Sequence, residues 1–225
     1  PQYDLDSALL AGARIWLSGA VPETDGITAG QRAAIVDFVR LFARHVFRRG
    51  GHIIHGSHPS FTPTLLAEAE RYQAHGGRKD CLVLAVSRYW SKDPKSVPIE
   101  AWRKIAVVYE TPESTGERAR DESLELLRKW LTSRCDAIIV VGGKWWQSVG
   151  GRAGVPLELE LAVARGIPCF LLGGLGGAAQ NFVRQHAEVF AQLKNGLDAV
   201  QNRELSTKED VGGLAEEVCN CLERL

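Results

Sequence analysis

A run of glycines in the middle of the chain precedes an acidic residue, Glu158, that could contact or cleave a bound molecule. An apolar run begins after Asp136 and ends at the first of these glycines. The candidate ligand-binding residues of the glycine-rich segment are Gly142, Gly143, Lys144, Gly150, Gly151 and Gly154. Glycine-rich turns after a buried parallel strand let backbone N–H groups approach a phosphate, and the start of a following helix favours an anion. The segment therefore predicts a nucleotide site. An acidic residue in a first helical turn also stabilises the helix without any ligand, so a purely structural role for Glu158 stays open.

Three further glycine-bearing turns follow predicted strands. They add Ser18, Gly19, Gly56, Ser57, His58 and Gly174 to the candidate ligand-binding residues. In a parallel sheet the carboxyl ends of the strands lie at one edge, so we expect these turns to surround one ligand, a phosphorylated nucleotide. The first strand is not followed by Gly-x-Gly-x-x-Gly, so this prediction does not depend on the usual dinucleotide fingerprint. The hydroxyls of Ser60 and Thr62 offer a simpler alternative, since either could cap the helix that follows.

Two arginines and two tryptophans could complete such a site. Arg118 and Arg120 lie in the expected first turn of a helix, where a positive charge opposes the helix dipole. We therefore expect a phosphate or a carboxylate beside them. Ion pairs with Glu117 or Asp121 on a solvated surface are the alternative. The adjacent tryptophans at 145–146 could stack on a base, or could pack against the protein instead.

The histidines at 52, 55 and 58 do not have the spacing of a metal site. Residues 52 and 55 of one strand point to opposite faces of a sheet. We therefore predict no metal site, and nothing in the sequence calls for a cofactor. His58, which lies in a turn, could contact a ligand.

Strand and helix patterns alternate along the chain and would position these residues. Apolar runs predict strands at 13–19, 52–56, 81–86, 104–109, 137–141 and 167–172. Apolar residues at helical spacing predict helices at 28–49, 62–75, 117–133, 156–165, 178–193 and 208–225, and residues 87–103 read as a long surface loop. The alternation predicts an α/β fold: one Rossmann-like, doubly wound, mainly parallel sheet with helices on both faces, in a single domain over 1–225. Ligands bind such sheets where the strand order reverses.

The composition disfavours several classes of partner. The 225 residues include 27 Lys and Arg against 27 Asp and Glu, so no net charge attracts nucleic acid or an anionic membrane. No apolar run reaches the roughly 18 residues that a membrane span needs, and the first residues do not resemble a secretory signal. The five scattered cysteines favour reduced thiols. We therefore expect a cytoplasmic protein that binds neither a membrane nor nucleic acid.

Several of these motifs together resemble the SLOG superfamily. They are Ile15-Trp16-Leu17-Ser18-Gly19, the turn 56–63, Gly142-Gly143-Lys144, Gly154–Glu158 with Leu161-Ala162, and Gly166-Ile167-Pro168. This Rossmann-like group includes the DprA/SMF proteins, the LOG phosphoribohydrolases and the ligand-sensing domain of TRPM channels. The likeness covers most of the chain and is nearest to bacterial SLOG domains associated with TIR and other anti-phage effectors.

The resemblance implies two different functions. Its sensor branch binds nucleotides derived from NAD, such as ADP-ribose and its cyclic forms. Its LOG branch cleaves the N-glycosidic bond of a nucleoside monophosphate, with an Arg and the Glu of a Pro-Gly-Gly-x-Gly-Thr-x-x-Glu motif. Here Arg118 or Arg120 would match that Arg, and Glu158 would match that Glu. The sequence departs from the motif, because Val141 replaces the Pro, Val155 replaces the Thr, and an insertion follows the glycine pair.

Three hypotheses follow. In the first, the chain is a cytosolic sensor of an ADP-ribose-type ligand in a bacterial anti-phage system, dimeric and joined to or associated with an effector. Arg120 and Lys144 would then balance the phosphate charge, and Glu158 would accept a ribose hydroxyl. In the second, Glu158 and Arg120 are the catalytic residues of a nucleoside 5′-monophosphate phosphoribohydrolase. In the third, the chain is an interaction domain with a vestigial site.

Overall fold

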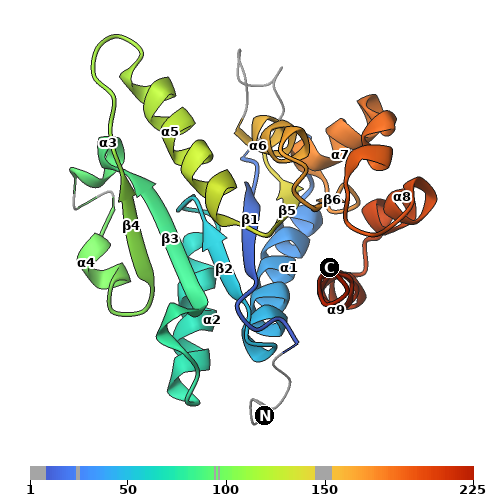
Figure 1. Cartoon of the computed structure of the whole chain (residues 1–225), viewed down its shortest axis with the longest axis horizontal. Coiled ribbons are helices and arrows are strands. Elements are labelled where there is room, and N and C mark those ends of the chain that lie inside the picture. Colours follow the sequence, from blue (N-terminus) through green and yellow to red (C-terminus); the bar gives the residue numbers. More distant parts are fainter. Residues whose placement is uncertain (1–8, 24–25, 94, 96, 145–153) are drawn as a thin grey trace.

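Six strands form one parallel sheet in the computed structural model, which describes residues 9–23, 26–93, 95, 97–144 and 154–225. The strands are β1 (Arg14–Ala20), β2 (His52–His55), β3 (Leu82–Ser87), β4 (Val107–Thr111), β5 (Ala137–Gly142) and β6 (Cys169–Leu172). Their order is β4-β3-β2-β1-β5-β6, and every neighbouring pair is parallel (Figure 1). This sheet confirms the predicted α/β fold. The strand order reverses between β1 and β5, which are both inner strands of the sheet.

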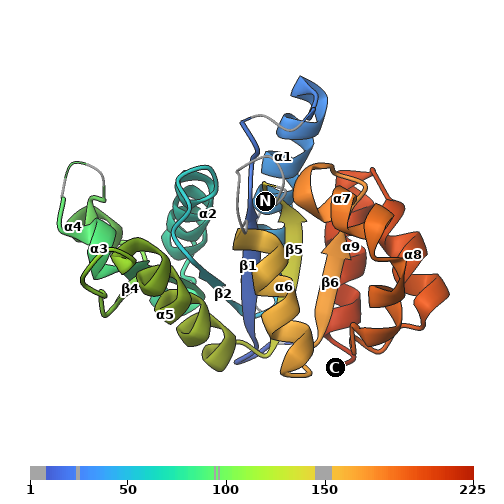
Figure 2. The ribbon, with the colours of Figure 1, turned by 90° about the horizontal axis from the view of Figure 1, so that it is seen from above.

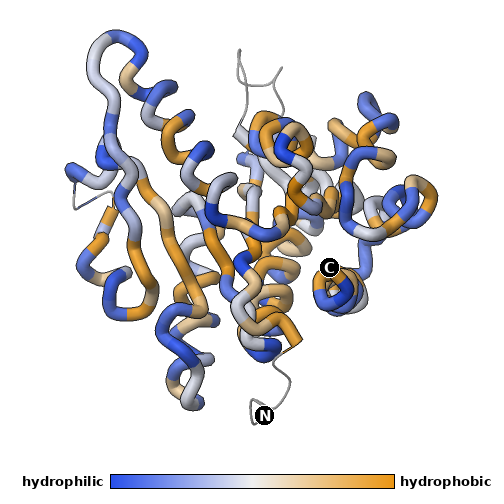
Figure 3. The backbone as a smooth tube through the Cα atoms, viewed as in Figure 1, coloured by the Kyte–Doolittle hydropathy of each residue, from blue (hydrophilic) through white to orange (hydrophobic). Residues whose placement is uncertain are grey.

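Helices cover both faces of the sheet (Figure 2). One face carries α1 (Ala29–Arg48), α2 (Thr62–Ala74) and α9 (Val211–Leu222), and the other carries α5 (Ala119–Arg134), α6 (Gly154–Ala164) and α7 (Gly177–Gln185). Side chains alternate between these faces along β1: Ile15 and Leu17 pack with α1, whereas Trp16 packs in the cluster formed with α5 and α6. Ser18 is therefore on the α5 and α6 face. Figure 3 shows the strands as mostly apolar and the connecting loops as mostly polar.

The long helix α1 begins and packs as the sequence predicts. The Thr28 side chain accepts a hydrogen bond from the backbone N–H of Gln31, and the Gln31 side-chain oxygen accepts one from the backbone N–H of Thr28. This capping box satisfies N–H groups that have no partner within the helix. The inward side chains Ile35, Phe38 and Phe42 are fully buried at helical spacing.

The structure differs from the sequence prediction in four places. The helix α6 begins at Gly154, two residues earlier than predicted, so Glu158 lies beyond its first turn and not within it. Two short helices, α3 (Arg88–Ser91) and α4 (Ile99–Trp102), lie in the segment predicted as a loop, and β4 begins only at Val107. The segment just before β4 continues the turn of α4, because the amides of Ile105 and Ala106 both donate to the Trp102 carbonyl. The helix predicted at 178–193 is divided after Gln185 into α7 and the 3-10 helix η3 (Ala187–Gln192). Finally, α8 (Ala199–Thr207), which the sequence analysis missed, begins at an Asp198 capping box.

None of the described helices is long and apolar enough to cross a membrane. All five cysteines are free thiols, and four of them are buried. Burial raises the pKa of Cys81 to about 11 and the pKa values of Cys135, Cys169 and Cys219 to about 12. These thiols therefore stay protonated at neutral pH and behave as small apolar side chains.

Candidate functional site

The candidate site lies at the carboxyl ends of β1 and β5. These two strands are paired directly, with Gly19 opposite Val141 and Ala20 opposite Gly142. After β1 the chain passes to the α1 face, and after β5 it passes to the α6 face, so the two connections diverge. Open α/β sheets bind ligands in the crevice that such a divergence leaves. The structure therefore brings the predicted turns after β1, β2 and β5 to one edge.

Glu158 is held at this edge from two other elements. The Ser18 hydroxyl on β1 donates a hydrogen bond of 2.6 Å to Glu158 Oε2. Arg128 Nε on α5 lies 3.5 Å from Glu158 Oε1. The side chains of Arg128 and Glu158 are only 13% and 18% exposed, so this ion pair is weakly screened by water. Three separate elements thus fix the position of one carboxylate.

Gly154 makes room for this arrangement. A Cβ atom added at Gly154 would lie 3.1 Å from Arg128 Nη2 and 3.6 Å from Glu158 Oε1. The guanidinium therefore rests against the first turn of α6 because that residue has no side chain. This contact gives Gly154 a role in packing, separate from the phosphate contact that we predicted for it.

Arg128 is the cation that the sequence analysis missed. Its Nε is buried and makes no hydrogen bond with a described residue, although it lies beside a carboxylate. Arg118 and Arg120, which we predicted in this role, are exposed at the start of α5, and neither forms an ion pair with Glu158. The signal was present in the sequence, since Arg128 is adjacent to Leu127 and three residues before Leu131 on the buried face of α5.

The glycine pair after β5 serves close backbone packing. Gly142 and Gly143 have φ angles of 63° and 84°, which residues other than glycine rarely adopt. The Gly143 N–H donates to the Ala20 carbonyl at 2.7 Å, and its carbonyl accepts from the Ala178 N–H at 2.9 Å. The Gly143 amide is therefore not available to a phosphate in this conformation. A Cβ atom at Gly177 would lie 2.9 Å from the Gly143 oxygen, so the turn after β5 and the start of α7 pack backbone against backbone.

Two other predicted glycines also pack closely. A Cβ atom at Gly19 would lie 2.2 Å from the Val141 carbonyl oxygen, and one at Gly174 would lie 2.2 Å from the Lys208 carbonyl oxygen. The Gly174 N–H donates to the Ser206 carbonyl at 2.6 Å, at the end of α8. Gly174 is therefore fixed against α8, and its amide is not directed at the crevice.

The turn after β2 is organised around a buried histidine. His55 is 2% exposed, its Nδ1 lies 2.9 Å from the Leu17 carbonyl, and its Nε2 accepts the His58 N–H at 3.1 Å. Burial lowers the pKa of His55 to about 4, so the ring is neutral at pH 7. Ser57 has a φ of 57°, and its hydroxyl donates to the Ala85 carbonyl at 2.9 Å. The ring of Phe61 packs on His55, with 5.6 Å between centroids.

The helix that follows this turn is not capped by a side chain. Phe61 occupies the N-cap position of α2, so the alternative in which Ser60 or Thr62 caps the helix is wrong. The Thr62 hydroxyl donates instead to the His58 carbonyl, and the Ser60 hydroxyl accepts the Val21 N–H at 3.0 Å. A Cβ atom added at Gly56, at the start of the turn, would lie 3.4 Å from Leu131 Cδ1, which is an ordinary van der Waals contact. The Thr62 hydroxyl thus stabilises the turn itself, and the Ser60 hydroxyl connects it to Val21, the residue after β1.

Lys144 lies at the same edge, with its Nζ 3.9 Å from Glu23 Oε2. The predicted residues Gly150 and Gly151, and the tryptophans at 145–146, lie outside the described residues. Among the residues that the structure does describe, no group of three or more His, Cys, Asp and Glu side chains could hold a metal ion.

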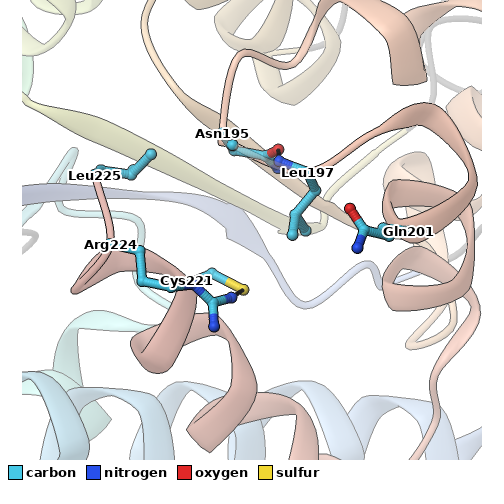
Figure 4. A pocket seen from close by; sticks show the side chains of 7 residues that line it. Asn195, Leu197, Gln201, Cys221, Arg224 and Leu225 are labelled. Carbon is cyan, nitrogen blue, oxygen red and sulfur yellow. Dashed lines mark hydrogen bonds between the residues drawn. The ribbon is translucent and has the colours of Figure 1, made fainter.

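A separate cavity of about 370 Å³ lies away from this edge (Figure 4). It is lined by Asn195, Gly196, Leu197, Gln201, Cys221, Arg224 and Leu225. The Asn195 side chain donates to the carbonyl of Cys169, the first residue of β6, so the cavity is at the amino end of that strand. The candidate site is at the opposite, carboxyl ends of the strands, where β1, α5 and α6 meet at Glu158. We therefore base the function on that edge and not on the cavity.

Comparison with known proteins agrees with the observed fold. Residues 103–207 match the model of a family described as SLOG cluster2, and this segment contains Arg128, the glycine pair and Glu158. The X-ray structure of TM1055, a structural genomics target, is similar in fold, with 15% identity and a TM-score of 0.50 over 76% of this chain and 81% of that chain. No curated protein has a sequence that matches the chain. The fold is that of a Rossmann-like α/β domain. The segment 103–207 is thus similar to the SLOG family, as the motifs of the chain predict.

Proposed function

We propose that the chain binds a nucleotide-derived ligand of the ADP-ribose type in the crevice between β1 and β5. The observation that carries this proposal is the Glu158 carboxylate, held by Ser18 and Arg128 at the point where the strand order reverses. In this fold such a crevice takes a nucleotide, and a carboxylate there accepts hydrogen bonds from ribose hydroxyls.

The contacts of Glu158 leave room for a ribose. An ionised carboxylate offers about four lone-pair directions. Ser18 occupies one of them on Oε2, and Arg128 approaches Oε1 without a hydrogen bond. The remaining directions can accept two vicinal hydroxyls. Arg128 and Lys144 supply positive charge for the phosphates of the same ligand.

A phosphoribohydrolase is the second candidate, and the buried Arg128–Glu158 pair favours it. A carboxylate in a weakly screened position stabilises an oxocarbenium-like ribosyl centre more strongly than an exposed one. Arg128 would then hold the 5′-phosphate in place of Arg118 or Arg120. The departures from the LOG motif at Val141 and Val155 lead us to place binding first.

The test is calorimetry with ADP-ribose, cyclic ADP-ribose, NAD and AMP, followed by chromatography of each mixture. We expect ADP-ribose or cyclic ADP-ribose to bind and to be recovered intact. Glu158→Gln should weaken binding at least tenfold, because a charged acceptor is lost from a poorly screened site. Glu160→Gln on the same helix is the matched control and should bind as the wild type does. Release of free base would establish the hydrolase, and the absence of binding by every nucleotide would refute both candidates.

The biological setting forms the last part of the proposal. A cytoplasmic role in bacterial anti-phage defence, an attached or associated effector and a dimeric assembly are supported by the resemblance to TIR-associated SLOG domains. Light scattering with and without ADP-ribose tests the assembly. A monomer at micromolar concentration in both conditions would refute the dimer.

A further inference from the structure

The turn after β2 fixes every polar atom of His58 except one. The His58 N–H donates to His55 Nε2, and the His58 carbonyl accepts from the amides of Phe61 and Thr62. The ring atom His58 Nδ1 lies 3.3 Å from the Ser60 amide nitrogen and 2.8 Å from the Ser60 hydroxyl. In the described part of the chain, no residue forms a hydrogen bond with His58 Nε2. The ring is thus held by its backbone and by one nitrogen, and the other nitrogen is left for a ligand.

Ser60 decides which nitrogen of His58 carries the proton. A backbone N–H can only donate, so the Ser60 amide requires Nδ1 to accept. The Ser60 hydroxyl already accepts the Val21 N–H at 3.0 Å, which directs its own hydrogen toward Nδ1. The amide contact requires an unprotonated Nδ1, and the hydroxyl can donate to that nitrogen as well. The neutral ring must therefore carry its proton on Nε2 and present it as a donor.

His55 has the opposite tautomer by the same reasoning. Its Nδ1 faces the Leu17 carbonyl, which can only accept, so that nitrogen is protonated. Its Nε2 receives the His58 N–H and must be unprotonated. The two histidines thus form a pair with opposite tautomers, linked through one backbone amide.

The charges around His58 keep it neutral and suit an anion. Burial lowers the pKa of His58, the nearby Lys144 cation lowers it further, and Glu23 opposes this effect. His55 adds no charge, because it is itself neutral. Protonation of His58 at Nδ1 would also place an N–H group against the Ser60 N–H, and this repulsion favours the neutral ring. The Lys144 ammonium group acts on this ring electrostatically, and its ion pair with a described residue, Glu23, is long at 3.9 Å.

We propose that His58 is a phosphate-binding residue of this site, and that its fixed Nε2–H and the Lys144 ammonium group bind one anionic phosphoryl oxygen. This inference rests on the proposed function and assigns the end of the ligand that holds the phosphate. An N–H donor beside a cation matches an oxygen of a phosphate group. Glu158, reached from the other side of β1 through Ser18, would then hold the ribose of the same molecule.

The first measurement is NMR of the ring nitrogens in the full chain labelled with ¹⁵N-histidine. We expect a protonated Nε2 for His58 and a protonated Nδ1 for His55 at pH 7. Inorganic phosphate or ADP-ribose should shift the His58 Nε2–H signal and leave the His55 ring signals in place. A protonated Nδ1 at His58 in the unliganded protein would overturn the inference.

The second measurement compares variants by calorimetry with ADP-ribose and with adenosine. His58→Ala should weaken ADP-ribose binding about tenfold, the loss expected for one hydrogen bond to a charged group, without weakening adenosine binding. His58→Gln, which offers an N–H near the same place, should stay within about threefold of the wild type. Equal affinity of His58→Ala and wild type for ADP-ribose would overturn the inference.

The outcomes separate this inference from the proposed function. Binding of ADP-ribose without any response at His58 refutes the phosphate role and leaves the function standing. Absence of ADP-ribose binding, together with a His58 Nε2 shift in inorganic phosphate, refutes the function and supports the anion site. No response to either compound refutes both.

Discussion

Acidification should destabilise this protein through His55, well before its carboxylates titrate. The pKa of His55 is about 4 in the folded chain, against 6.5 for an unperturbed histidine, because the ring is buried. Between these values the unfolded chain binds one more proton than the folded chain. The free energy of unfolding therefore falls as the pH falls below 6.5, and the loss is complete near pH 4.

The size of the effect follows from the two pKa values. A difference of about 2.5 units corresponds to about 3 kcal/mol in total. Between pH 7 and pH 5 the expected loss is about 2 kcal/mol, and this window lies above the range in which Asp and Glu titrate. Urea unfolding at both pH values measures it. His55→Asn should lack this part of the pH dependence, so its change between pH 7 and pH 5 should be smaller by about 2 kcal/mol.

A second core variant separates titration from simple destabilisation. Phe61→Leu removes the ring that packs on His55, so it weakens the same region without removing a titrating group. It should unfold more easily than wild type and keep the full pH dependence. If wild type and His55→Asn lose equal stability between pH 7 and pH 5, the reasoning is refuted. NMR gives a check that does not depend on folding of the variant, since His55 should remain unprotonated at pH 5.

Two stability predictions concern the packing of the site and of α2. Gly143→Ala should cost about 3 kcal/mol, because φ is 84° and the new Cβ would lie 2.5 Å from Val155; Gly116→Ala, with a φ of 94° but open space, should cost about 1 kcal/mol. Equal costs would refute the close contact. Glu68→Gln should cost about 3 kcal/mol, because this 2% exposed carboxylate pairs with two arginines, whereas Asp37→Asn in an exposed pair should cost under about 0.5 kcal/mol. Urea unfolding measures all four, and a loss below about 1 kcal/mol for Glu68→Gln would contradict this account.

The sheet and most helices could be predicted from local patterns. Buried parallel strands are continuous apolar runs, so 137–141 and 81–86 identify β5 and β3 without any tertiary information. The short helix α8 was missed because its sequence, Ala199–Thr207, is largely polar, and its stability comes from the Asp198 cap and from contacts with β6. Its capping residue was the one local signal available.

The site was only partly predictable, because its chemistry depends on contacts between distant residues. The sequence indicates Glu158 and the glycine turns, but not that Ser18, 140 residues away, would hold the carboxylate. It also cannot tell whether a glycine N–H is left for a ligand. The amide of Gly143 is used by Ala20, and that of Gly174 by Ser206. Both bonds arise from sheet pairing and helix packing, which local patterns do not encode.

The central place of β1 determines when the candidate site can exist during synthesis. One edge of β1 pairs with β2, the next strand in the chain. The other edge pairs with β5, so the partner of Ile15, Ala137, is synthesised much later. Until β5 leaves the ribosome, the growing sheet has an unpaired apolar edge that could pair with another chain. Ser18 and Glu158 are even further apart in the chain, by 140 residues. A product that stops before β5 therefore has no ligand site, and its exposed edge makes it a target for chaperones and proteases.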